Sequence, residues 1–152
     1  MAKITGSREY MANLTLSYSE VEKVMTAQQV IYEKGLVKLE SNSMITALGP
    51  VATVLGLAFV TSTPAGIAAG VAGIISGLVG SAKAELDSLV KNGYWELGKT
   101  RDFLKNNPKY THVELKLPFI EYTLDAKDKI RFITGKGVLV RVKTSTGWIP
   151  FE

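Results

Sequence analysis

The sequence of 152 residues has no cysteine and a single histidine. Without cysteine the chain has no disulfide, no thiolate metal ligand and no cysteine nucleophile. One imidazole, that of His112, is too few for a histidine metal site. Acidic residues of the C-terminal part, such as Glu114 and Glu121, are spread among lysines and indicate no general acid/base pair. We therefore expect a protein that is not an enzyme and that holds no metal or cofactor.

An apolar leader is also missing from the start of the chain. Residues 1–10 contain Lys3, Arg8 and Glu9 and no apolar run, so they do not form a secretory signal. This pattern predicts synthesis in the cytoplasm without a signal peptide, followed by association with a membrane if the apolar segment described next contacts lipid.

Charge is missing from the middle of the sequence. Residues 41–82 contain no Lys, Arg, Asp, Glu or His, whereas residues 1–40 carry five basic and five acidic side chains and residues 83–152 carry 13 and nine. The net charge of +4 therefore belongs to the C-terminal part. A segment of 42 uncharged and largely apolar residues predicts a surface that lipid or protein must cover.

The segment Thr61-Ser62-Thr63-Pro64 divides this region into two helices. Thr63 as N-cap and Pro64 at the first helical position form a strong helix start, because proline lacks only a donor that is unpaired there. We expect the second helix to begin at residue 64 and the first to run from about 44 or 50 to 60, with Pro50 opening or kinking it. Together they predict an apolar helical hairpin over residues 44–82.

Glycine recurs at helical spacing along the second helix. Five glycines in a water-exposed helix would cost about 4–5 kcal/mol relative to alanine, so a closely packed neighbour must offset them. Small residues at this spacing are typical of helices that pack tightly in lipid, and Gly49, Ala52 and Gly56 offer a matching small face on the first helix. The residues predicted to pack the hairpin are Gly49, Gly56, Pro64, Gly66, Gly70, Gly73, Gly77 and Gly80.

Before the hairpin, the sequence predicts a helix over about 19–34. Ser17 and Ser19, each followed three residues later by a glutamate, are capping-box candidates. Leu14 to Leu16 suits a short strand or an extended lead-in. Around Gly35 two readings stay open for residues 30–40, a continuation of the helix or a β-hairpin that turns at Lys34-Gly35.

After the hairpin, apolar residues at helical spacing predict a helix that ends near Asn92-Gly93 and a shorter one that stops before Asn107-Pro108. Between them, Gly93 to Thr100 matches the phosphate-binding pattern G-x-x-x-x-G-K-[ST]. A buried strand should precede such a loop, but residues 84–91 have a helical pattern. We take the match as chance and expect no nucleotide to bind.

From residue 111 the apolar period changes to two, which indicates β-strands. Ile130 and Phe132 precede Gly135-Lys136-Gly137, and Val138, Val140 and Val142 follow it, so this stretch predicts a β-hairpin with a short glycine loop. Another turn at residues 144–147 leads to a last strand, where Pro150 favours an edge position.

Basic residues accompany aromatic ones in these strands. On a solvated sheet face they have no special role, but a cationic face beside an inserted hairpin would suit anionic headgroups, and a basic sheet with stacking aromatics would suit nucleic acid. Nucleic acid is the weaker of these expectations. The residues concerned are Lys129, Arg131, Lys136, Arg141 and Lys143.

Taken together, the sequence predicts a single α+β domain over residues 1–152. Residues 19–106 are mainly helical, with an N-terminal helix and the apolar, glycine- and alanine-rich hairpin, and residues 111–151 form a small antiparallel β-sheet. The main hypothesis is a non-enzymatic bacterial or phage protein that uses residues 44–82 as a membrane anchor or pore-forming element. The alternative is a soluble structural or assembly protein whose hairpin is buried in a homo-oligomer.

Overall fold

The computed structural model describes residues 4–125 and 128–151 and confirms the α+β class. The helices are α1 (Tyr18–Ile31), α2 (Ser41–Leu48), α3 (Leu55–Phe59), α4 (Pro64–Gly77) and α5 (Ser81–Asn106). The strands are β1 (Ile4–Ser17), β2 (His112–Leu124), β3 (Lys129–Ile133), β4 (Val138–Thr144) and β5 (Gly147–Pro150).

The sheet is built around β2, which pairs on one side with β1 and on the other with β3 and β4 in succession. Its strands are antiparallel, with Phe132 opposite Ile120 at one end of β2 and Val142 opposite Val113 at the other. The predicted hairpin between β3 and β4 is therefore wrong, since both strands pair with β2 rather than with each other. The turn at residues 144–147 does form a hairpin, and β5 lies at the edge where Pro150 placed it.

The first strand is much longer than the expected extended lead-in. β1 runs from Ile4 to Ser17 and pairs along the whole length of β2, for example Leu14 with Leu115. Only Leu14 and Leu16 of this strand are buried, and most of its other side chains face solvent. A strand with so few apolar positions gives a weak period-two signal, which explains why the sequence predicted only its end.

The predicted helix over 19–34 corresponds to α1. Ser17 caps it: the Ser17 hydroxyl accepts from the Glu20 backbone N–H, and the Glu20 carboxylate accepts from that of Ser17. The chain then continues as a π-turn, Tyr32–Leu36, so the alternative β-hairpin at Lys34-Gly35 is wrong. Gly35 is buried there, because a Cβ would come 2.9 Å from methyl groups of both Met44 and Val71.

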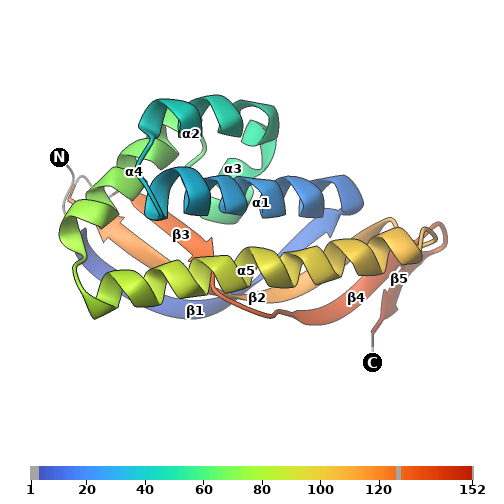
Figure 1. Ribbon diagram of the computed structural model, residues 1–152. Helices are drawn as coiled ribbons and strands as arrows, with labels where there is room; N and C mark the ends of the chain where they lie inside the picture. Colours follow the sequence, from blue (N-terminus) through green and yellow to red (C-terminus); the bar gives the residue numbers. More distant parts are fainter. Residues whose placement is uncertain (1–3, 126–127, 152) are drawn as a thin grey trace.

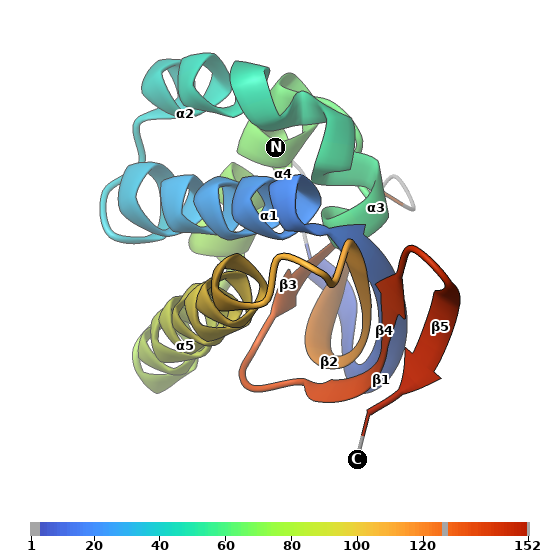
Figure 2. The same cartoon turned by 90° about the vertical axis from the view of Figure 1, so that its right-hand side faces the viewer.

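The apolar segment forms a broken first helix and a regular second one. A 3₁₀ turn, Gly49–Val54, with Pro50 near its start separates α2 from α3. As predicted, α4 begins at Pro64, and the Thr63 hydroxyl accepts from the Gly66 N–H. In Figures 1 and 2, α1 and α5 lie across the sheet, α2 lies beyond α1, and α3 and α4 approach the sheet at one end.

One uninterrupted helix, α5, replaces the two predicted around Gly93. Gly93 does not end the helix but allows it to touch β3, because a Cβ there would overlap the Ile133 carbonyl oxygen and the Gln28 amide nitrogen. The buried side-chain amide of Gln28 in α1 links α5 to β3 through hydrogen bonds. Its Nε2 donates to the carbonyls of Val90 (2.9 Å) and Ile133 (2.7 Å), and its Oε1 accepts from the Ile133 N–H (2.9 Å). The free edge of β3 is thus sealed between α1 and α5.

Candidate membrane-binding surface

Most of the bulky side chains of residues 41–82 are buried within the single chain. Seven of the largest are Met44, Leu48, Leu55, Phe59, Ile67, Val71 and Ile74, and each is 0% exposed. The predicted cover of this segment is therefore supplied in large part by the rest of the same chain. Helix α2 packs on α4, and α1, α5 and the sheet supply the remaining cover.

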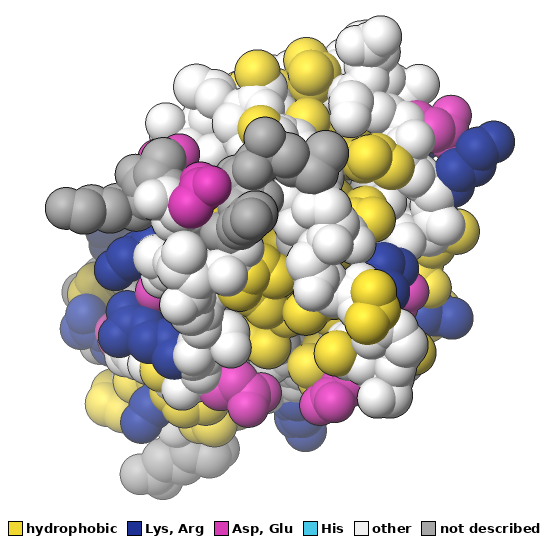
Figure 3. Space-filling model, turned by 90° about the vertical axis from the view of Figure 1, so that its left-hand side faces the viewer, with side chains coloured by type: hydrophobic (Ala, Val, Ile, Leu, Met, Phe, Trp, Pro, Cys, Tyr) yellow, Lys and Arg dark blue, Asp and Glu magenta, His cyan; other side chains and the backbone are white. Residues whose placement is uncertain are grey.

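The outward side of this segment is uncharged and mostly small. Its exposed large apolar residues are Leu57 (41%), Val60 (43%) and Val79 (78%), which lie before and after α4 in the sequence. Between them α4 exposes Ala65, Ala69 and Ser76. Figure 3 shows this side of the molecule: yellow and white atoms fill its upper part, and charged side chains gather toward the margins and the lower part.

One helical stretch of the described residues, Ser41–Phe59, is long and apolar enough to cross a membrane. Length and composition alone are weak evidence, because core helices of soluble proteins meet the same criteria. Here 39% of its most apolar 18-residue window is buried, so much of the stretch lies at the surface. Helix α4 is apolar but shorter.

The glycines do not join the two helices in the predicted way. A Cβ at Gly70 would contact Ile130, and one at Gly77 would contact Ile4, so these two positions face the sheet. A Cβ at Gly56 would contact Ser62, and one at Gly49 would meet nothing within 4 Å. Gly49 and Gly56 of the first helix therefore do not contact the glycines of α4. Of the remaining predicted positions, Gly73 is buried, Gly66 lies against Thr61 and Thr63, and Gly80 has open space and a φ of 59°.

An arginine from the sheet holds the end of α3. Arg131 of β3 donates to the carbonyls of Ala58 (3.0 Å) and Leu57 (2.9 Å), which the short helix leaves without helical partners. Its guanidinium lies 3.9 Å from the centre of the Phe119 ring and also donates to the Tyr10 hydroxyl (3.1 Å). This contact ties the apolar segment to the sheet.

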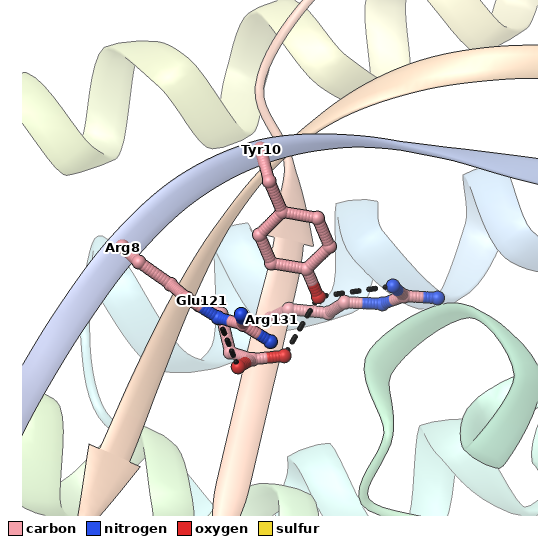
Figure 4. A network of polar contacts seen from close by, with 4 residues as sticks. All are labelled: Arg8, Tyr10, Glu121 and Arg131. Carbon is pink, nitrogen blue, oxygen red and sulfur yellow. Dashed lines mark hydrogen bonds and ion pairs between the residues drawn. The ribbon is translucent and has the colours of Figure 1, made fainter.

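A buried carboxylate orients this arginine (Figure 4). Glu121, 3% exposed, accepts from Tyr10 (2.7 Å) and from Arg8 (3.0 Å), and the Tyr10 hydroxyl in turn accepts from Arg131. Burial acts to raise the pKa of Glu121. The hydrogen bonds from Tyr10 and Arg8, with the charges of Arg8 and Lys129, outweigh it, so the pKa lies below its ordinary value. The carboxylate is thus ionised at neutral pH and fixes the Tyr10 hydroxyl beside Arg131.

Two further polar contacts are made by residues on either side of α4 in the sequence. The Thr61 hydroxyl donates to the Lys129 carbonyl (2.6 Å), and Lys83 donates to the Leu36 carbonyl (2.7 Å) while pairing with Asp87. Between α3 and α4, Val60 has a φ of 71°, a conformation that a β-branched residue rarely adopts. The Thr61 contact therefore lies directly beside a strained turn.

The five basic residues predicted to contact an anionic surface do not share one face. Arg131 points toward the helices, whereas Arg141 pairs with Glu114 (2.6 Å) on the opposite face and lies 4.3 Å from the Trp148 ring centre. Lys143, Lys129 and Lys136 are exposed. The structure therefore breaks up the predicted cationic face.

The structure does not give Gly93–Thr100 the loop conformation that its sequence motif requires, and it gives His112 no metal-binding neighbours among the described residues. Gly93 to Thr100 lies inside α5 and cannot wrap a phosphate as a loop does. The His112 ring forms a hydrogen bond with the neighbouring Thr111 hydroxyl (3.0 Å), and residues 4–125 and 128–151 hold no group of three or more potential metal ligands.

The chain matches no protein-family model, no curated protein and no solved structure.

Sequence reasoning missed the network of Arg8, Tyr10, Glu121 and Arg131. A signal for it is present, because Leu117, Phe119 and Glu121 alternate along β2, which places a carboxylate where the pattern demands a buried residue. A charge at a buried position requires a partner. The partner residues came from β1 and β3, whose pairing with β2 the sequence did not reveal.

Proposed function

We propose that this protein is a non-enzymatic membrane-associating protein whose contact with lipid is made by the uncharged segment of residues 41–82. The observation that supports this function is a continuous uncharged helical layer at the surface, with Leu57, Val60 and Val79 exposed around α4. A membrane interface accepts such a surface because no charge has to leave water.

The proposed contact places α4 along the membrane. Its 14 residues are about 21 Å long at 1.5 Å per residue, so Val60 and Val79 would enter the interface near its two ends. The Ser41–Phe59 stretch adjoins it and supplies the length for deeper anchoring. For deeper insertion, the segment would have to give up the contacts made by Arg131 and Thr61.

Vesicle co-sedimentation tests this proposal. We expect the protein to sediment with vesicles of phosphatidylcholine and phosphatidylglycerol, and the double variant Leu57→Asp/Val79→Asp to lower the partition coefficient at least about tenfold, since each buried apolar side chain contributes about 1.5–3 kcal/mol. The matched control is Met11→Asp/Ile149→Asp, which places the same charges at two exposed apolar residues of the sheet, 45% and 46% exposed.

Two results would contradict it. One is protein that stays in the supernatant at every lipid concentration, and the other is an equal loss of binding in both double variants. Light scattering without lipid then tests the alternative, a soluble assembly protein whose apolar hairpin is buried in a homo-oligomer. A stable homo-oligomer that Leu57→Asp/Val79→Asp dissociates would show that a second copy covers this surface.

A further inference from the structure

A second surface feature lies away from residues 41–82, between the C-terminal half of α5 and the strand β4. It is an open cleft of about 550 Å³, within the range typical of small-molecule sites. The cleft starts one turn beyond Gly93, where α5 is in contact with β3. Beyond that contact, α5 has no further glycine that permits such a close approach to the sheet. The side chains of Glu96, Lys99 and Phe103 line the helix wall of the cleft.

The walls of the cleft are apolar, and part of this apolar surface faces water. Leu115 and Leu139 line the sheet side. Val138 and Phe151 also line the cleft and are 58% and 41% exposed, so two large apolar side chains meet solvent at one place. Phe151 is held there by its N–H, which donates to the Val140 carbonyl (3.1 Å), and by an edge-on contact with Phe103. Apolar surface kept in place around a hollow suits an apolar ligand.

The charges at the cleft specify the polar end of such a ligand. Lys99 pairs with Glu96 (3.0 Å), which makes that pair neutral. Lys136 also lines the cleft, is exposed, and has no ion-pair partner within residues 4–125 and 128–151. Among the described residues that line the cleft, the three charged groups therefore leave one net positive charge, at its rim. An anionic head complements this charge.

We propose that the cleft between α5 and β4 binds a free, single-chain anionic amphiphile of the fatty-acid class. The chain lies against Phe103, Leu139 and Phe151, and the carboxylate lies beside Lys136. This inference does not depend on the proposed contact of residues 41–82 with lipid, because the two surfaces share no residue.

Titration calorimetry with decanoate below its micelle concentration tests the site in the absence of any membrane. We expect saturable binding of one decanoate per chain, and at least fivefold weaker binding of decyltrimethylammonium, which has the same chain length and the opposite charge. Lys136→Glu should weaken decanoate binding at least fivefold. The matched control Lys143→Glu makes the same charge change at an exposed residue outside the cleft, and should stay within twofold of the unmodified protein.

The apolar wall is tested by Leu139→Asp, with far-ultraviolet circular dichroism to confirm folding. If that variant does not fold, Val138→Asp replaces it, because Val138 is exposed. Either is expected to abolish saturation. The proposal is overturned if decanoate shows no saturable binding, if the cationic amphiphile binds equally well, or if Lys143→Glu weakens binding as much as Lys136→Glu. It is also overturned if the protein self-associates and Val138→Asp abolishes that association, because a second copy then fills the cleft.

Discussion

The strands β3 and β4 pair one after the other with the same edge of β2, yet the helices cover them very differently. In β3, Ile130, Phe132 and Ile133 are completely buried, and the Gln28 amide seals the strand's free edge. In β4 only Val142 is buried, and the cleft opens beside Val138 and Leu139. The helix α5 passes both strands. The difference has two causes: Gly93 permits a close approach of α5 at β3, and α3 and α4 also pack on β3.

The largest expected effect comes from a substitution that blocks the close contact of α5 with β3. Gly93→Ala places a methyl group into the Ile133 carbonyl and the Gln28 amide, both fixed by hydrogen bonds, so we expect a loss of about 3 kcal/mol in the free energy of unfolding, measured with urea. Gly98→Ala is the control in the same helix. Its methyl would lie 3.6 Å from the Met25 sulfur, an ordinary contact, and should stabilise the protein by up to about 1 kcal/mol. Equal effects of the two changes would refute the special role of Gly93.

A second comparison concerns one arginine on each strand. Arg131→Met on β3 removes the donors for the carbonyls of Leu57 and Ala58 and should cost about 2 kcal/mol, because hydrogen bonds to charged groups are strong. Arg141→Met on β4 removes an ion pair with Glu114 whose arginine side chain is 43% exposed, and should cost less than about 1 kcal/mol. Thermal unfolding of both variants at neutral pH measures the contrast. If Arg141→Met were the more damaging, Arg131 would not hold α3.

The smallest expected effect is a change in acid stability. The pKa of Glu121 lies below its unfolded value of about 4.3. Its contribution to stability is therefore complete above the unfolded value and is lost as the pH falls through the lower folded value. Glu121→Gln should flatten the decline in unfolding free energy below about pH 5.

Glu114 provides the comparison on the β4 side. Hydrogen bonds from Asn13 and Arg141 lower its pKa as well. Because Glu114 is on the outer, solvated face, Glu114→Gln should flatten the acid decline less than Glu121→Gln, and its effect should shrink further in high salt. Urea unfolding between pH 3 and pH 7 measures both variants, and a larger effect at Glu114 would argue against the buried network.

Local signals predicted much of this fold. The capping box at Ser17, the start of α4 at Pro64 and the edge position of Pro150 each depend on a few neighbouring residues, and each is confirmed. The absence of charge between Ser41 and Ala82 marked the region that packs as separate apolar helices. In each of these cases, the residues that determine the local structure lie within one helical turn or one hairpin of each other in the sequence.

The remaining features depend on residues far apart in the sequence. Gly93 resembles a helix end until β3 is placed beside it, and the two glycines before Val138 resemble a hairpin turn until both flanking strands are seen to pair with β2. The network at Glu121 unites strands that are more than 100 residues apart, β1 and β2. No local pattern contains such pairings, because they depend on how the whole sheet is assembled.

The long pairing of β1 with β2 has a consequence for synthesis. Leu14 of β1 pairs with Leu115 of β2, so the ribosome must add about a hundred further residues before these two strands can pair. The uncharged helices emerge during this interval, before Ile130 and the other sheet residues that will cover them exist. The nascent chain therefore exposes its most apolar segment before the strands β2 and β3 that cover it have been made, and during this interval the segment is prone to aggregate.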